Sequence, residues 1–271
     1  MSAPALNRAR AGTRGILHPH VSRRHYSLER LPPRPELRFF VQQLWVVEWD
    51  LSEPFTALVL PHPNSNLCVM AGRSRISGVG RRVFAERLQG TGRVVGVTYR
   101  PGGLRALHDA PARSLTGADI AVSAVYDVDV AALEELVLSA DVPTALDRIQ
   151  DLLRSRIPAR DGQADLVGDI VDAVVGDRSL GRVEQVAGRF ALSVRRLQRL
   201  FADYVGVTPK WVLMRARLHD ATDAVGDGTP PDWARLAAEL GYCDQAHLVR
   251  AFTSVLGISP GEYVRRSVDR S

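Results

Sequence analysis

Cysteine, lysine and long apolar runs are all scarce in this chain of 271 residues. The two cysteines, Cys68 and Cys243, lie far apart, and neither belongs to a CxxC or Cys/His metal-binding spacing. Two isolated thiols exclude a disulfide framework and indicate a reducing compartment. The lack of an apolar run of about 18 residues excludes a membrane-spanning helix. We therefore expect a cytoplasmic protein without a membrane partner.

The N-terminus lacks the apolar segment and small-residue cleavage site of a secretory signal. Residues 1–22 are polar, rich in arginine and without periodicity, so we predict a disordered basic arm there. An organelle transit peptide has a similar composition, and residues 1–24 alone leave that alternative open.

Lysine occurs once, as Lys210, and all other basic residues apart from histidine are arginine. This bias is typical of a GC-rich genome and does not indicate an arginine-specific function. The net charge of +5 is concentrated at the ends, because residues 1–39 carry eight arginines against two glutamates and residues 40–179 are acidic. Residues 180–271 carry 13 basic and 10 acidic residues. A basic end suits a polyanionic partner, although a solvated surface explains so mild an excess equally well.

The chain is long enough for about two domains, and its first half has the texture of β-structure. Short β-branched runs alternate with proline, asparagine and glycine, at Leu44–Trp49, Thr56–Leu60, Leu67–Met70, Arg75–Val79, Val83–Leu88 and Val94–Tyr99. Helical spacing follows at Leu104–His108, Val130–Ala140 and Pro143–Arg156. We predict an α+β protein of two domains, with a mainly β N-terminal domain over residues 23–157. This domain would be cupin-like or a small barrel with trailing helices.

A polar stretch with proline and glycine, residues 158–163, is the predicted linker, and an all-α domain of residues 164–271 follows it. We predict seven helices, near 164–176, 180–188, 193–204, 209–225, 231–240, 244–255 and 260–266. N-cap residues precede four of them, at Ser193, Thr208, Asp244 and Ser259. Left-handed residues are expected after three helices, at Gly206, Gly241 and Gly257.

Two segments of this second domain share one pattern, Val186–Phe201 closing with Val205–Pro209, and Leu236–Phe252 closing with Leu256–Pro260. Each has a short helix with a small alanine, Ala187 or Ala237, then a turn and a helix of pattern Leu-x-Arg-x-Phe. The predicted buried faces are Leu197, Leu200 and Phe201 in one copy, and Leu248, Ala251 and Phe252 in the other. A polar face is left outward, as a helix-turn-helix needs to place one helix in a major groove.

One long helix, Pro209–Val225, separates the two copies. A rigid helix of about 17 residues is about 25 Å long. It could hold two recognition helices on one side of a duplex, in major-groove segments about 34 Å apart.

At these motifs the C-terminal region resembles the AraC/XylS family of bacterial transcription regulators. The resemblance is carried by Ser193–Phe201, Gly206–Pro209, Arg217-Leu218 with Ala221, Ala237–Tyr242, His247–Phe252 and Gly257–Pro260. Cys243, just before the second recognition helix, and the Gly- and Pro-rich loop 226–231 depart mildly from the pattern. The resemblance implies a sequence-specific regulator, activator or repressor, whose partner is double-stranded DNA.

Carried over to this sequence, the family pattern suggests the DNA-binding residues. In the first recognition helix Arg195, Gln198 and Arg199 would face the groove, with Ser193 and Arg196 near phosphates. In the second, Gln245, Ala246, His247, Val249 and Arg250 would be outward, with Gln245 and Arg250 favoured. Arginine suits guanine and glutamine suits adenine, because both pairings are bidentate. For each residue, a solvated helix face or a phosphate contact is the alternative. Trp211, Trp233 and Tyr242 are expected in the core.

In this family the N-terminal part usually senses a ligand or mediates dimerisation. Here it resembles a poorly characterised sensor-type domain, through its aromatic early strand and Tyr99–Gly103, and this implies no known ligand. A small-molecule effector and a homodimer are therefore both expected partners. We considered a pocket lined by Trp45, Trp49, Phe55 and Tyr99, on the strength of their aromatic bulk alone.

No cofactor, metal or catalytic residue is expected. The HxH strand spacing of metal cupins is missing, and His62 lies in a Pro-His-Pro-Asn turn. Cys68 is expected to be a buried apolar residue, with a redox sensor as the alternative. Two other functions stay open: a regulator fused to an alkyl-transfer DNA-repair activity, for which clustered cysteines are lacking, and a non-specific nucleic-acid module driven by the basic arm.

Overall fold

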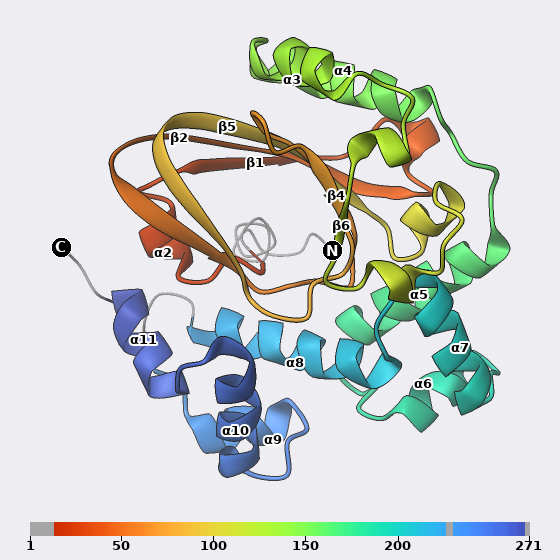
Figure 1. The fold of residues 1–271 in the computed structure, drawn as a ribbon. Coiled ribbons are helices and arrows are strands. Elements are labelled where there is room, and N and C mark those ends of the chain that lie inside the picture. Colours follow the sequence, from red (N-terminus) through yellow and green to blue (C-terminus); the bar gives the residue numbers. More distant parts are fainter. Residues whose placement is uncertain (1–13, 226–229, 269–271) are drawn as a thin grey trace, which may run out of the picture.

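The computed structural model describes residues 14–225 and 230–268 and shows a mainly β N-terminal part beside an all-helical C-terminal part (Figure 1). The bent sheet lies above the long helix α8 (Pro209–Val225) in this view, and the remaining C-terminal helices gather at the two ends of α8. The predicted α+β fold class, with a mainly β N-terminal domain and an all-α C-terminal domain, is confirmed.

Within the described residues, six antiparallel strands form one sheet in the order β1-β2-β5-β3-β4-β6. Their bounds are β1 (Ser27–Leu31), β2 (Val41–Val59), β3 (Asn66–Val69), β4 (Arg75–Ser77), β5 (Phe84–Tyr99) and β6 (Asp119–Ile120). The sequence patterns did not predict β1 and β6. Strand β1 lacks β-branched residues and β6 is two residues long, so neither carries a strand signal.

The two longest strands join segments that the sequence suggested were separate. Strand β2 contains both Leu44–Trp49 and most of Thr56–Leu60, and its pairing with β5 shifts register between Leu51 and Phe55. Strand β5 joins the predicted runs Val83–Leu88 and Val94–Tyr99 through Gly90 and Gly92, which the sequence presents as a break. A Cβ atom at Gly96 would lie 2.1 Å from the Trp45 ring, so this glycine serves ring packing.

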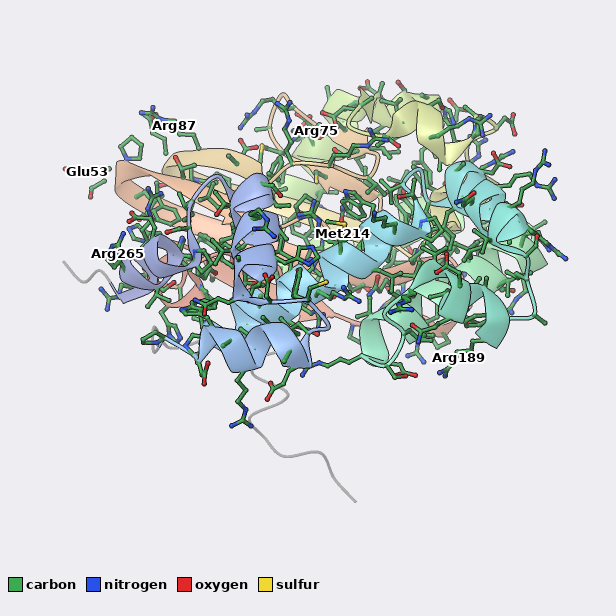
Figure 2. The ribbon with its side chains drawn as sticks, turned by 90° about the horizontal axis from the view of Figure 1, so that it is seen from below. Glu53, Arg75, Arg87, Arg189, Met214 and Arg265 are labelled. Atoms are coloured by element: carbon green, nitrogen blue, oxygen red, sulfur yellow. The ribbon has the colours of Figure 1, made fainter. Side chains whose placement is uncertain are left out.

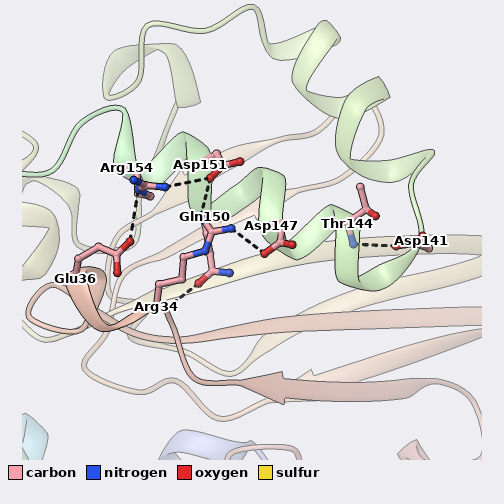
Figure 3. A network of polar contacts seen from close by, with 8 residues as sticks. All are labelled: Arg34, Glu36, Asp141, Thr144, Asp147, Gln150, Asp151 and Arg154. Atoms are coloured by element: carbon pink, nitrogen blue, oxygen red, sulfur yellow. Dashed lines mark hydrogen bonds and ion pairs between the residues drawn. The ribbon is translucent and has the colours of Figure 1, made fainter.

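Helices α3 (Val130–Leu138) and α4 (Val142–Arg154) cover one face of the sheet and confirm two of the three predicted trailing helices. The third is a short 3-10 helix, η2 (Gly103–Ala106). Polar contacts fix α4 to the turn before β2 (Figure 3). The Arg34 guanidinium pairs with Asp147 at 2.9 Å and with Asp151 at 2.6 Å.

All seven predicted C-terminal helices are present. They are α5 (Gly162–Gly176), α6 (Val183–Arg189), α7 (Val194–Tyr204), α8, α9 (Trp233–Glu239), α10 (Gln245–Leu256) and α11 (Pro260–Val268). The predicted caps are confirmed as well: the side chains of Ser193, Thr208, Asp244 and Ser259 each accept a backbone N–H three residues ahead. Gly206, Gly241 and Gly257 have φ angles of 91°, 71° and 74°.

The predicted disordered arm is only partly within the described residues, since residues 1–13 lie outside them. Residues 14–22 are ordered, which the sequence did not predict: Leu17 is buried between the sheet and the C-terminal helices, and Pro19–Ser22 form the short helix α2. The Leu17 N–H donates to the Leu58 carbonyl at 3.0 Å. So short an apolar anchor has no periodicity for a sequence pattern to reveal. No helix of the described residues is long and apolar enough to span a membrane.

Candidate nucleic-acid interface

Two helix-turn-helix units, α6–α7 and α9–α10, are built in the same way. Their small alanines, Ala187 and Ala237, are buried where the two helices of each unit cross. In both turns a backbone N–H returns to this alanine: Leu192 N donates to Ala187 O, and Tyr242 N to Ala237 O, each at 2.9 Å. The duplicated sequence pattern thus corresponds to a duplicated backbone arrangement.

The two turns differ in length and in the residue that adopts the left-handed backbone conformation. The left-handed position is Gly241 in the second unit but Ala191, with φ 52°, in the first. Ala191 is followed by one residue before the N-cap Ser193, whereas Tyr242 and Cys243 separate Gly241 from the N-cap Asp244. The second turn is therefore one residue longer, and Cys243 is exposed in it.

The first recognition helix, α7, has one apolar and one basic face. Leu197, Leu200 and Phe201 are buried, whereas the five predicted contact residues are exposed: Ser193, Arg195, Arg196, Gln198 and Arg199. Within the described chain, none of these three arginines forms an ion pair. By contrast, nearby Arg189 pairs with Asp177 at 2.6 Å. Helix α7 therefore presents guanidinium groups that no carboxylate of the described residues neutralises.

The second recognition helix, α10, presents a smaller polar surface. Gln245, Ala246 and Arg250 are exposed, whereas His247 and Val249 are half-buried. The His247 ring packs edge-on against buried Tyr242, with ring centroids 5.2 Å apart. Arg250 has no ion-pair partner among the described residues.

Helix α8 joins the two units through two separate apolar clusters. Val212, Leu213 and Ala216 belong to the core of α5–α7, whereas Leu218, Ala221 and Val225 belong to the core of α9–α11. Of the aromatic residues expected in the core, Tyr242 is buried, and Trp211 and Trp233 are half-buried against these clusters. Seen from below, α8 carries Met214, which is 40% exposed, in the middle of the molecule (Figure 2).

The N-terminal part contacts the first unit at the end of α7. The side chain of Thr116, just after the 3-10 helix η3 (Ala112–Leu115), donates to the Gly206 carbonyl at 2.7 Å. Arg113 forms an ion pair with Asp203 on α7. A Cβ atom at Gly206 would lie 2.7 Å from the Ala112 carbonyl oxygen, so only glycine fits this close approach.

A second contact joins the sheet to α8. The rings of His62 and His219 stack with centroids 4.0 Å apart, and His219 Nε2 lies 3.2 Å from the Pro61 carbonyl oxygen. Burial lowers the pKa of His62 to about 4 and that of His219 well below its ordinary value. Both rings are therefore neutral at pH 7.

A third contact runs from the N-terminal segment to α8 and α11. Arg14 pairs with Asp220 of α8 at 3.1 Å. The His18 ring stacks on Tyr263 of α11 with centroids 4.3 Å apart, and its Nδ1 lies 2.8 Å from the Ser267 hydroxyl. Sequence analysis missed all three contacts, because each joins residues far apart in the chain with no local signal.

The aromatic pocket considered from the sequence is not assembled. Tyr99 is fully buried with its hydroxyl 3.0 Å from that of Tyr126, and Phe55 stacks on His25. Trp49 borders an open hollow of about 450 Å³ between Arg23–Ser27 and the β2–β5 ladder.

The described residues contain no group of three or more His, Cys, Asp or Glu side chains placed to hold a metal ion. Desolvation raises the pKa of the Cys68 thiol to about 12, so it is protonated at pH 7 and a weak nucleophile.

Comparison with known proteins agrees with this construction. Residues 186–266 match a family described as a helix-turn-helix domain, of the AraC type, and residues 29–121 match a domain of unknown function, DUF6597.

Several solved structures are similar at low identity. The C-terminal domain of AraT, a response regulator from Geobacillus stearothermophilus, is 22% identical, covers 38% of this chain and 86% of its own, and has a TM-score of 0.34. ToxT from Vibrio cholerae O395 is 12% identical over 90% of this chain and 98% of its own, with a TM-score of 0.42. These similarities are too distant to establish a function, which rests on the helix-turn-helix match. That match spans both units built above, and the protein is a DNA-binding transcription regulator with an AraC-type helix-turn-helix domain in its C-terminal part.

Proposed function

We propose that the protein binds promoter DNA with α7 and α10 in successive major-groove segments. The observation that carries this proposal is the face of α7, where three arginines with no carboxylate partner among the described residues stand opposite a buried apolar face. Unneutralised guanidinium groups on a helix suit phosphates and guanine edges. The repeat of the same unit around α10 supplies a second helix for the next segment.

Within this proposal the contact residues divide by position. Arg195, Gln198 and Arg199 recur at helical spacing along one face of α7, and we assign them to base edges. Ser193 and Arg196, at the start of the helix, are assigned to phosphates. In the second unit, Gln245 and Arg250 are the expected base contacts and Ala246 an apolar contact.

The half-buried positions of His247 and Val249 support only a peripheral role for them. Helix α7 carries three exposed arginines and α10 only Arg250. We therefore assign the larger share of the electrostatic binding energy to the first unit.

We further propose that the N-terminal part modulates DNA binding. It contacts α7 through Arg113, α8 through His62 and α11 through His18, so a change in its structure would reach the helices that pack in both units. A small-molecule effector and self-association as a homodimer are both compatible with this arrangement. The domain boundaries that we propose are residues 23–157 for the sensor part and 164–271 for the DNA-binding part, with residues 158–163 as the linker.

We propose that the protein acts in the cytoplasm, by binding and not by catalysis. An alkyl-transfer activity would need a nucleophilic thiolate, and the raised pKa of Cys68 argues against one there. Methyl transfer to Cys68 in an incubation with alkylated DNA would contradict this view.

Selection from a random DNA pool, followed by gel-shift titration over a range of salt concentrations, tests the DNA-binding mode. We expect a selected sequence with two half-sites and an affinity at least about 10³-fold above that for bulk competitor DNA. Two half-sites indicate a bound monomer, and four indicate a dimer. No preference over competitor DNA would refute the proposal.

A further inference from the structure

Arg217 connects the two helix-turn-helix units through one side chain of α8. Its Nη2 donates to the Gly181 carbonyl at 2.7 Å, and its Nη1 donates to the Gly241 carbonyl at 3.3 Å. Gly181 stands just before α6 of the first unit, and Gly241 lies in the turn of the second. The guanidinium also lies over the Tyr242 ring, 5.7 Å from its centroid.

Each of the two carbonyl groups is held in place by a hydrogen bond that the N–H of its own peptide unit donates. In the first unit, the Arg182 N–H donates to the Gln185 side chain at 2.9 Å and so fixes the plane that contains the Gly181 carbonyl. In the second, the Tyr242 N–H donates to Ala237 O at 2.9 Å and fixes the Gly241 carbonyl. Arg217 therefore binds two acceptors whose directions are set by the helices of their own units.

Both glycines leave room for the guanidinium. A Cβ atom at Gly181 would lie 2.9 Å from Nη2, and one at Gly241 would lie 3.3 Å from the same atom. Arg217 has no ion-pair partner among the described residues, so it connects the units through directed hydrogen bonds and not through an ion pair. A planar guanidinium holds its donors in fixed directions, whereas a lysine ammonium does not.

We propose that Arg217 is a positioning residue that sets the distance and rotation between the two recognition helices. It thereby determines which spacing of DNA half-sites the protein accepts. This inference rests on the proposed binding of DNA by both units. Two modules held at a fixed separation gain affinity only for sites at the matching separation, and a looser connection gains less but accepts more spacings.

The first test needs no DNA. Spin labels at Glu184→Cys on α6 and Thr253→Cys on α10, in a Cys243→Ser background, report the distance between the units by pulsed electron resonance. We expect a narrow distance distribution for the labelled protein that keeps Arg217 and Gly181. The distribution should be clearly broader for Arg217→Lys and for Gly181→Ala, because the new Cβ of the latter displaces the guanidinium. Arg265→Lys, on α11, is the matched control and should leave the distribution narrow. Equal widths for all variants would overturn the proposal.

The second test measures affinity for the selected operator and for operators with one or two base pairs inserted or removed between the half-sites. We expect the unsubstituted protein to lose about 100-fold in affinity when the spacing is altered. Arg217→Lys should bind the optimal operator about tenfold more weakly than the unsubstituted protein, and altered spacing should then lower its affinity by less than about threefold. Thermal unfolding of each variant verifies that it is folded. If Arg217→Lys weakens binding equally at every spacing, its role is merely structural and the proposal fails. Absence of any sequence preference in the unsubstituted protein would instead refute the proposed function, while the spin-label test still decides the role of Arg217.

Discussion

Arg196 and Arg199 are both exposed on α7, yet the proposed interface gives them different tasks. Arg199→Ala should cost about 1–3 kcal/mol of binding free energy and relax the preference at one base pair, because a bidentate base contact is lost. Arg196→Ala should weaken binding uniformly across sequences and reduce the salt slope by about one, because a phosphate contact is lost. Anisotropy titrations on the operator and its single-base variants, at several salt concentrations, separate the two. If both variants weaken all sequences alike, the assignment of Arg199 to a base edge is wrong.

Ala191 occupies a left-handed backbone conformation that its counterpart, Gly241, adopts at no steric cost. Ala191→Gly should therefore stabilise the protein by up to about 1 kcal/mol, since removal of the Cβ strain outweighs the added entropy of the unfolded chain. Gly241→Ala should destabilise it, because the same strain is introduced beside the Arg217 guanidinium. Urea unfolding measures both changes. A loss of stability in Ala191→Gly would show that the turn carries no strain.

At this scale the sequence predicts what helical periodicity controls. The outward position of Arg195, Gln198 and Arg199 follows from the 3.6-residue repeat around buried Leu197, and these side chains are exposed in the structure. His247 does not follow the same rule, because its ring packs on Tyr242 from the turn that precedes α10. A turn one residue longer than its counterpart changes such a contact without altering the helix pattern.

At the scale of elements, the N-terminus of α10 depends on Asp244, whose carboxylate accepts the His247 N–H at 2.6 Å. Asp244→Ala should lower the free energy of unfolding by about 1 kcal/mol, because the cap is lost. Asp244→Asn keeps the cap and removes a negative charge beside the proposed interface. It should retain stability and bind DNA more tightly than the unsubstituted protein. This gain in affinity should be larger at low salt than at high salt, because salt screens the repulsion between Asp244 and the phosphates. Denaturation and salt-dependent titrations measure these effects, and unchanged affinity of Asp244→Asn at low salt would place α10 away from the phosphates.

The predictability of an element depends on the range of the contacts that define it. Caps such as Asp244 act over three residues, so the seven C-terminal helices follow from the sequence. The divided prediction of β5 has a non-local cause, because Gly92, in the gap between the two predicted runs, is required by the ring of Trp49 on the neighbouring strand. The ordered segment of residues 14–22 is similarly set by distant partners, among them Tyr263.

On the scale of the whole molecule, one interface joins the sheet, the N-terminal segment and α8. The stacked rings of His62 and His219 lie at its centre, and arginines approach from several elements: Arg14 from the N-terminal segment, Arg30 from β1 and Arg215 from α8. Asp220 of α8 already pairs with Arg14 and Arg178. Two further positive charges on the rings would therefore be unfavourable here.

This interface should make stability depend on pH. Histidines of the unfolded chain take up protons near pH 6.5, whereas burial lowers the pKa of folded His62 to about 4. Between these values the unfolded state binds more protons, so the stabilising contribution is complete above about pH 6.5 and is lost as the pH falls toward 4. His62→Phe keeps a ring in the stack and removes one titrating group. It should reduce the loss of unfolding free energy between pH 7 and pH 5 by about 1–2 kcal/mol.

Urea unfolding at the two pH values, followed by tryptophan fluorescence, measures this difference. His20→Gln, a substitution of an exposed histidine in α2, is the matched control and should retain the full loss. Arg215 separates electrostatic coupling from simple burial, because its guanidinium lies close enough to lower the pKa of both rings. Arg215→Met should therefore raise the pKa of both rings in the folded protein and make the free energy of unfolding less sensitive to pH. Equal pH dependence of His62→Phe and the unsubstituted protein would show that the stacked rings do not couple protonation to the contact between the sheet and α8.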